Sequence, residues 1–161
     1  MKNLFVLVLG LLLSSEFSLA QNSWYVDGSK PNGNGSFSSP FNSIKAAQAK
    51  VSKGDTVFVL PGTYNLSKTI ETSSNGTKNE RISYKAFNPE MKPLLTIADR
   101  VLDVRHAYHS FESFIFDSQF AKDDIVRVRS TGDHLILKNC EIRNSQQDGI
   151  DISGGDSVLI D

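Results

Sequence analysis

The sequence is almost without cysteine, since Cys140 is the one thiol among 161 residues. A single thiol excludes the internal disulfide framework that stabilises many small secreted domains. We therefore expect Cys140 to be a small apolar residue of the core.

An excess of charge of either sign is also missing. The chain has 17 basic and 18 acidic residues, which gives a formal net charge of −1. Nucleic-acid-binding proteins carry basic patches, so the composition gives no support for nucleic acid as a partner. Any ligand has to be inferred from individual sites.

Long apolar runs are absent after the N-terminus. Lys2 precedes the apolar segment Leu4–Leu13, and Ser18-Leu19-Ala20 has the small-x-small pattern of a cleavage site. These features predict a secretory signal peptide at residues 1–20, with Gln21 as the first mature residue and an extracellular or periplasmic destination. Because no later segment approaches about 18 apolar residues, we expect no membrane span.

Helical periodicity is confined to one segment, PFNSIKAAQAKVSKGD. Apolar residues recur there at steps of three and four from Phe41 to Val51, with Ser39 and Pro40 as the start signal and Gly54 as the stop. Residues 21–54 therefore predict a short strand, a Gly/Asn/Ser-rich loop and a capping helix. Trp24 and Tyr25 in that strand could stack on a sugar ring, but their place at the start of the domain favours cap packing.

Short apolar runs separated by turns fill residues 55–161. The expected strands are 56–60, 82–86, 94–97, 101–104, 111–116, 125–128, 135–137, 150–152 and 158–160. Alignment of these runs places Val126 over Ile150, a step of 24, Leu135 over Val158, a step of 23, and Phe111 over Leu137, a step of 26.

A repeat of this length indicates a solenoid, and strands as the repeating unit indicate a right-handed parallel β-helix. The fold class is therefore all-β, with the early helix covering the N-terminal end. Asn139, at a turn, could belong to an amide ladder. The chain stops just after the apolar run at 158–160, so we expect residues 55–161 to be the first coils of an incomplete solenoid. We expect the protein to be a monomer.

The three histidines have no metal-ligand spacing with one another or with Cys140, so we expect surface histidines at positions 106, 109 and 134.

Several stretches resemble known enzymes. The segment from WYVDGSKPNGNG to GDTVFVLPGTY resembles the N-terminal cap and first coil of secreted β-helix polysaccharide lyases. NCEIRNSQQDGIDIS is similar to family 9 pectate lyases, and SSNGTKNERISYKAFNP is similar to family 6 alginate and chondroitin lyases. The resemblance implies an acidic polysaccharide as substrate, cleaved by calcium-assisted β-elimination.

In family 9, a DDxxD-like cluster and an aspartate one coil earlier bind the catalytic Ca2+. The resemblance carries this role to Asp148 and Asp151, whereas Gln147 departs from the pattern. The earlier aspartate corresponds to Asp123 or Asp124, and the step of 24 places Asp124 under Asp148. No catalytic base is carried over.

The residues themselves leave a second interpretation of these aspartates open. The same alignment places Arg127 under Asp151, and with Arg129 it could neutralise the patch as an ordinary surface ion-pair ladder. Three functions therefore stay open: a polysaccharide lyase, a uronan C5-epimerase or glycoside hydrolase of the same fold, and a non-catalytic glycan-binding β-helix.

Overall fold

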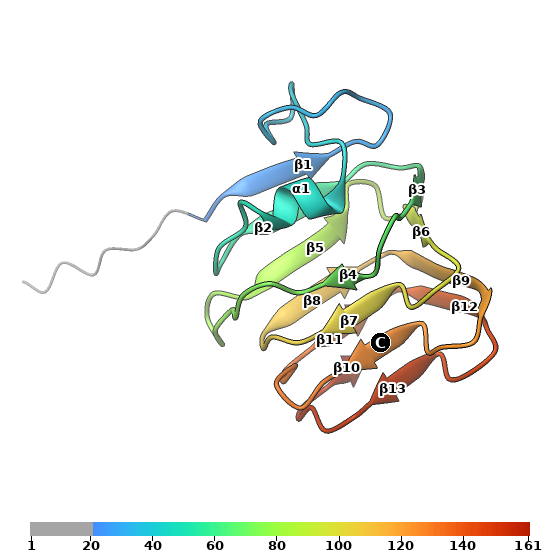
Figure 1. Cartoon of the computed structure of the whole chain (residues 1–161). Coiled ribbons are helices and arrows are strands. Elements are labelled where there is room, and N and C mark those ends of the chain that lie inside the picture. Colours follow the sequence, from blue (N-terminus) through green and yellow to red (C-terminus); the bar gives the residue numbers. More distant parts are fainter. Residues whose placement is uncertain (1–20) are drawn as a thin grey trace, which may run out of the picture.

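The computed structural model describes residues 21–161, and the predicted signal peptide at 1–20 lies outside the described residues. The chain winds into coils that stack along one axis, from the blue N-terminal end to the red C-terminal end (Figure 1). The elements in chain order are β1 (Ser23–Val26), α1 (Ile44–Gln48), β2 (Thr56–Val59), β3 (Thr63–Asn65), β4 (Ile70–Glu71), β5 (Ile82–Ala86), β6 (Leu94–Thr96), β7 (Leu102–Val104), β8 (His109–Glu112), β9 (Ile115–Ala121), β10 (Val126–Val128), β11 (Ile136–Lys138), β12 (Glu141–Ser145), β13 (Ile150–Ile152) and β14 (Leu159–Ile160).

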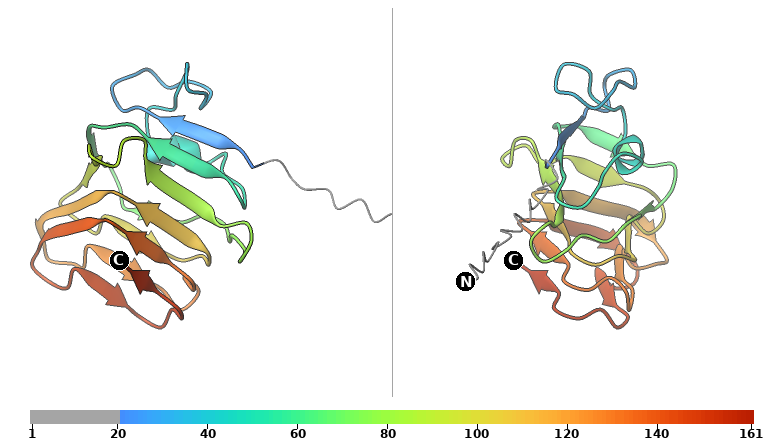
Figure 2. Two further views of the ribbon diagram at one scale, coloured as in Figure 1. Left: turned by 180° about the vertical axis from the view of Figure 1, so that it is seen from behind. Right: turned by 90° about the vertical axis from the view of Figure 1, so that its left-hand side faces the viewer.

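The strands form three parallel sheets, to which each full coil contributes one strand (Figure 2). We call them the six-stranded sheet (β1-β2-β5-β8-β11-β14), the β4 sheet (β4-β7-β10-β13) and the β3 sheet (β3-β6-β9-β12). The predicted repeat is confirmed, because Val126 pairs with Ile150 and Phe111 pairs with Leu137. The parallel β-helix expected from the sequence is therefore the fold.

Inward side chains stack from coil to coil to form the core. Val57, Tyr84, Phe111 and Leu137 hold the same register in successive strands of the six-stranded sheet, and all four are buried. The rings of Tyr84 and Phe111 stack with centroids 4.8 Å apart and planes 6° from parallel. Each fully buried side chain of this size contributes roughly 1.5 to 3 kcal/mol, so the stack is a major source of stability.

Some strand predictions were wrong in detail. The expected strand 111–116 is divided between β8 and β9, because Ser113 adopts a left-handed conformation (φ 65°) and turns the chain from one sheet to the next. The sequence analysis missed β3 and β4, which have three and two residues, and β12, whose sequence EIRNS is largely polar. Short or polar strands carry little alternation to detect.

The N-terminal end has a helix, but it is shorter than expected. Only Ile44–Gln48 is helical, and its N-cap is Ser43 rather than Ser39, with the Ser43 hydroxyl accepting a hydrogen bond from the amide of Ala46. Ile44 is buried against the core, and Gln48 Nε2 donates to the carbonyl of Glu71 at 2.9 Å. These contacts tie α1 to the first coil.

Trp24 has the cap-packing role expected of it. Its indole Nε1 donates to the buried carboxylate of Asp55 at 2.9 Å, and its ring lies 5.9 Å from that of Phe41. Tyr25 points to the other side of β1, where it meets three further aromatic rings.

Two further expectations were wrong. His109 is a core residue, 1% exposed, and not a surface histidine. Asn139 does not belong to an amide ladder: its amide nitrogen donates to Ser113 Oγ at 2.9 Å and its oxygen accepts from Lys92 Nζ at 2.9 Å. Cys140 is half-buried, carries a free thiol and packs against the core.

Within residues 21–161, no helix has both the length and the apolar character needed to cross a membrane.

Candidate functional site

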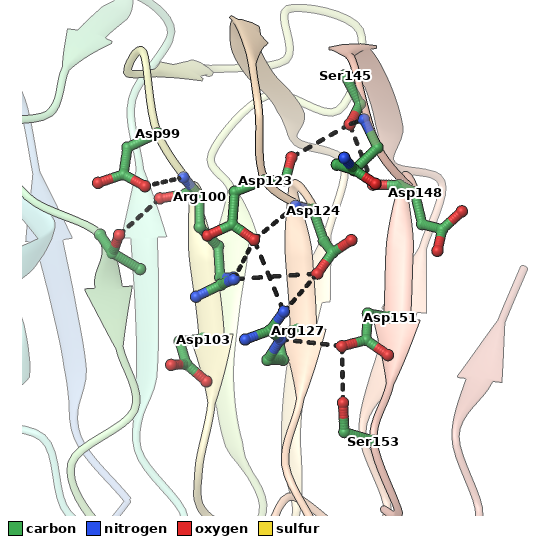
Figure 3. A network of polar contacts seen from close by, with 12 residues as sticks. Asp99, Arg100, Asp103, Asp123, Asp124, Arg127, Ser145, Asp148, Asp151 and Ser153 are labelled. Carbon is green, nitrogen blue, oxygen red and sulfur yellow. Dashed lines mark hydrogen bonds and ion pairs between the residues drawn. The ribbon is translucent and has the colours of Figure 1, made fainter.

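The four predicted metal ligands lie on the outer face of the β4 sheet (Figure 3). Asp123 and Asp124 precede β10, Asp148 precedes β13, and Asp151 is the central residue of β13. Strand pairing places Arg127 of β10 directly opposite Asp151. The coil repeat therefore brings these side chains to one face, as the sequence predicted.

Three equivalent positions recur on this face in successive coils at the step of 24 residues. The members of this charged ladder are Asp99, Arg100 and Asp103; then Asp123, Asp124 and Arg127; then Gln147, Asp148 and Asp151. Charges alternate fully in only one of the three columns, Asp103, Arg127 and Asp151, and a second column begins with the opposite charges of Arg100 and Asp124.

Arg127 is the centre of the charged ladder. Its Nη2 donates to Asp124 Oδ2 at 2.7 Å, its Nε donates to Asp151 Oδ2 at 2.9 Å, and its Nη2 lies 3.6 Å from Asp123. The hydrogen bond to Asp124 is the main reason that the pKa of Arg127 is raised. The ion-pair arrangement considered from the sequence is thus present.

Arg100 is a second cation of the ladder, which the sequence analysis missed. Its side chain is 11% exposed, bonds to Asp123 and lies 3.9 Å from Asp124. The signal for it was available, because Arg100 precedes Asp124 by 24 residues, the coil step.

The ion-pair interpretation also placed Arg129 at the aspartate patch, but Arg129 pairs with Asp103 instead. Both oxygens of Asp103 accept from Arg129 at 2.9 Å, and Arg105 Nη2 adds a third bond at 3.0 Å. The Asp103 side chain is only 1% exposed. Burial by itself would raise the pKa of Asp103, but the hydrogen bonds from Arg129 and Arg105 outweigh it and lower the pKa.

Asp151 and Asp148 have different surroundings. Asp151 Oδ2 accepts from Ser153 Oγ at 2.6 Å as well as from Arg127, and these bonds, the one from Ser153 first, lower the pKa of Asp151. Asp148 is exposed, and Figure 3 shows its carboxylate pointing away from Arg127. Its backbone carbonyl accepts from Ser145 Oγ at 3.2 Å.

This geometry can be tested against the demands of calcium, which takes six to eight oxygen ligands. Arg127 lies between Asp124 and Asp151 and bonds an oxygen of each, while Asp148 points elsewhere. In the described part of the chain, no three acidic, histidine or cysteine side chains converge as a metal site would require. The four aspartates, as arranged here, do not fit a calcium ion.

The comparisons with known proteins identify the fold. The sequence model of a family described as "Pel9A-like, right handed beta helix region" matches residues 24–160. No curated protein matches the chain. A solved structure described as "Rhamnogalacturonan lyase" superposes with a TM-score of 0.58 at 18% identity, over 74% of this chain and 36% of that one.

A second solved structure is described as "Crystal structure of pectate lyase Pel9A". It superposes with a TM-score of 0.53 at 19% identity, over 78% of this chain and 40% of that one. The chain thus spans 36% to 40% of the length of these two structures. At such identities the likeness concerns the fold.

Proposed function

Because the chain belongs to the family of Pel9A-like right-handed β-helix regions, we propose that it is part of a secreted lyase that cleaves an acidic, uronate-containing polysaccharide such as pectate. The observation that carries this proposal is the family match over residues 24–160, which includes every coil of the described structure. The two solved structures, described as a rhamnogalacturonan lyase and a pectate lyase, share the fold on which this proposal places the reaction.

The reaction proposed is β-elimination. A base removes the C5 proton of a uronate residue, the electron pair forms the C4–C5 double bond, and the glycosidic oxygen at C4 leaves. The C5 proton is weakly acidic while the neighbouring carboxylate is fully charged, so a cation beside that carboxylate lowers the barrier. We place the substrate on the outer face of the β4 sheet, where Arg127 supplies a partly exposed guanidinium group.

The proposed role of Arg127 is to position and partly neutralise the sugar carboxylate. A guanidinium binds carboxylate oxygens in a planar, bidentate manner. Arg127 still has 25% of its side chain exposed, although two aspartates hold it in place. The base is left unassigned.

Calcium assistance, the other part of the original expectation, rests on the family resemblance alone. The side chains that would hold the ion are Asp148, which is exposed, and Asp151, which has one oxygen free of Arg127. Because the present arrangement does not fit the ion, we derive no step through it. When bound, calcium would supply charge stabilisation next to the uronate carboxylate.

The test is product analysis with the secreted protein on polygalacturonate, rhamnogalacturonan and alginate, with added calcium and with chelator. A lyase creates an unsaturated sugar that absorbs in the ultraviolet, in step with new reducing ends. New reducing ends without this absorbance would indicate a glycoside hydrolase, and a change of uronate configuration without cleavage would indicate an epimerase. Either result would contradict the lyase.

A non-catalytic, glycan-binding β-helix is the second candidate. It is favoured by the ion pairs of Arg100 and Arg127, which together involve three of the four predicted calcium ligands, Asp123, Asp124 and Asp151. This function predicts saturable binding of a uronate polymer with neither ultraviolet absorbance nor new reducing ends.

A further inference from the structure

Four aromatic rings gather on the outer face of the six-stranded sheet, near its N-terminal end. Tyr25 lies 5.3 Å from Phe37, 5.6 Å from Phe58 and 6.2 Å from Phe87, measured between ring centroids. Phe37 and Phe87 are themselves 5.6 Å apart. We call these four residues the aromatic platform.

The strands and the loop after β1 build the platform together. Tyr25 of β1 and Phe58 of β2 are direct register partners, and their rings stack at an interplanar angle of 23°. Phe87 follows β5 and Phe37 comes from the loop between β1 and α1. The next register partner of Phe58 is Lys85, whose ammonium is paired with Glu112 at 3.3 Å, so an ion pair borders the rings.

Two of the rings are unusually open to solvent. Phe37 is 60% exposed and Phe87 is 46% exposed. Aromatic surface in contact with water is unfavourable, and clusters of it commonly mark interaction sites.

A cavity with both apolar and polar side chains in its wall adjoins the platform. It has a volume of about 440 Å³, and Phe37 lines it together with Lys30, Asn32, Ser38 and Asp27. Phe37 therefore belongs both to an apolar surface and to a cavity with an ammonium, an amide, a hydroxyl and a carboxylate in its wall. A ligand that uses both must have an apolar face and a polar rim.

We propose that the aromatic platform and this cavity form a binding site for a uronate-containing oligosaccharide, separate from the charged ladder of the β4 sheet. A pyranose ring presents C–H groups on its faces and hydroxyls at its edge, which match stacking rings beside polar side chains. Lys30, which lines the cavity, complements the uronate carboxylate. The substrate class rests on the proposed function, whereas the site rests on the rings and the cavity.

The size of the platform argues against a second copy of the chain as its occupant. An aromatic side chain offers about 150 to 250 Å², so the exposed parts of Phe37 and Phe87 provide roughly 200 Å². A stable protein interface buries about 800 Å² on each partner. The apolar area is thus too small for a dimer and suits one or two sugar rings.

The experiment is titration calorimetry of the full chain with a defined oligogalacturonate. We expect Phe37→Ala and Phe87→Ala each to weaken binding at least about fivefold. Phe120→Ala is the matched control, because Phe120 is also 60% exposed but lies on β9 of the β3 sheet. Its affinity should equal that of the wild type.

The role of the Lys30 ammonium group is tested separately. Lys30→Met should weaken binding of the oligogalacturonate and leave binding of a neutral oligosaccharide of the same length unchanged. Equal losses for both ligands would overturn the role given to Lys30.

Two results would overturn the proposal. The first is an affinity of Phe37→Ala equal to that of the wild type, and the second is sedimentation showing that Phe37→Ala abolishes self-association rather than sugar binding.

Product analysis of the same variants separates this site from the proposed function. Lyase activity with no contribution from Phe37 to binding would refute the platform alone. Binding that depends on Phe37, with no unsaturated product, would refute the lyase alone.

Discussion

His109 should make the protein sensitive to mild acid. His109 is the first residue of β8 and is only 1% exposed. Its ring stacks on that of Tyr84, with an angle of 15° between the two ring planes. Nε2 lies 2.8 Å from the carbonyl of Ser74, so Nε2 carries the proton and donates. Among the described residues Nδ1 has no hydrogen-bond partner. A second proton would therefore be placed on a buried nitrogen without an acceptor.

The magnitude follows from the pKa. Burial lowers the pKa of His109 from 6.5 to about 4, so the unfolded chain takes up the proton first as the pH falls. The stability that neutral His109 contributes is complete above about pH 7 and is lost between about pH 6.5 and 4. At 1.36 kcal/mol for each pKa unit, the full loss is about 3 kcal/mol, and about 2 kcal/mol is lost by pH 5.

Urea denaturation at pH 7.5 and pH 5 measures this loss. The variant His109→Gln keeps a donor for the carbonyl of Ser74 but cannot titrate, so its unfolding free energy should change by about 2 kcal/mol less than that of the wild type over this interval. His134→Gln serves as the control, since His134 is only half-buried and stacks on Tyr108. If wild type and His109→Gln lose the same free energy, the reasoning is refuted.

Three other predictions concern the ladder and the core. Arg127→Gln removes three ion pairs, of which the two closest are those to Asp124 and Asp151, and should lower the unfolding free energy by about 1 to 2 kcal/mol in urea. Because it frees these two carboxylates from Arg127, calcium should raise its melting temperature more than that of the wild type, and an equal response would contradict the ladder. Asp103→Asn leaves two arginines without their carboxylate and should cost about 2 kcal/mol at pH 7. The lowered pKa of Asp103 means that its contribution is present above about pH 4 and lost below it, so the cost should shrink at pH 3, and a constant cost would refute this. Phe116→Ala empties a fully buried position and should cost about 3 to 5 kcal/mol, whereas Phe120→Ala should stay within about 0.5 kcal/mol of the wild type; equal losses in thermal unfolding would contradict the burial argument.

The architecture was predictable because a solenoid repeats its apolar positions. The repeat steps of 24 and 26 residues predicted the register of Val126 with Ile150 and of Phe111 with Leu137, and both pairs are observed. Strand boundaries were less predictable, since the corner at Ser113 depends on a left-handed residue that is neither glycine nor asparagine. The helix predicted from the sequence was too long, because four apolar residues have helical spacing. In the structure the helix spans Ile44–Gln48, and only Ile44 and Ala47 are buried within it.

The candidate site was predictable in its position but not in its pairing. The coil step located Asp124, Asp148 and Asp151 on one face, yet Arg129 and Arg127 could both reach that face from β10 and its end. Which arginine bonds which aspartate depends on side-chain direction and burial: Asp103 is 1% exposed and takes Arg129, leaving Arg127 to Asp124 and Asp151. The spacing of residues in the sequence gives neither the direction of a side chain nor its burial.

Charge alternation in the ladder follows from the geometry of the fold. Neighbouring coils are about 4.8 Å apart, and at an effective dielectric constant of 20 two like charges at that distance repel by about 3.5 kcal/mol. Glu71 and Asp103 face each other in register, and Arg105 relieves their repulsion by bonding Glu71 at 2.7 Å and Asp103 at 3.0 Å. Arg127 does the same for Asp124 and Asp151 one coil further along. In such a stack, every column of carboxylates needs cations, and the residue at position 127 decides whether the protein itself or an ion from solution provides them.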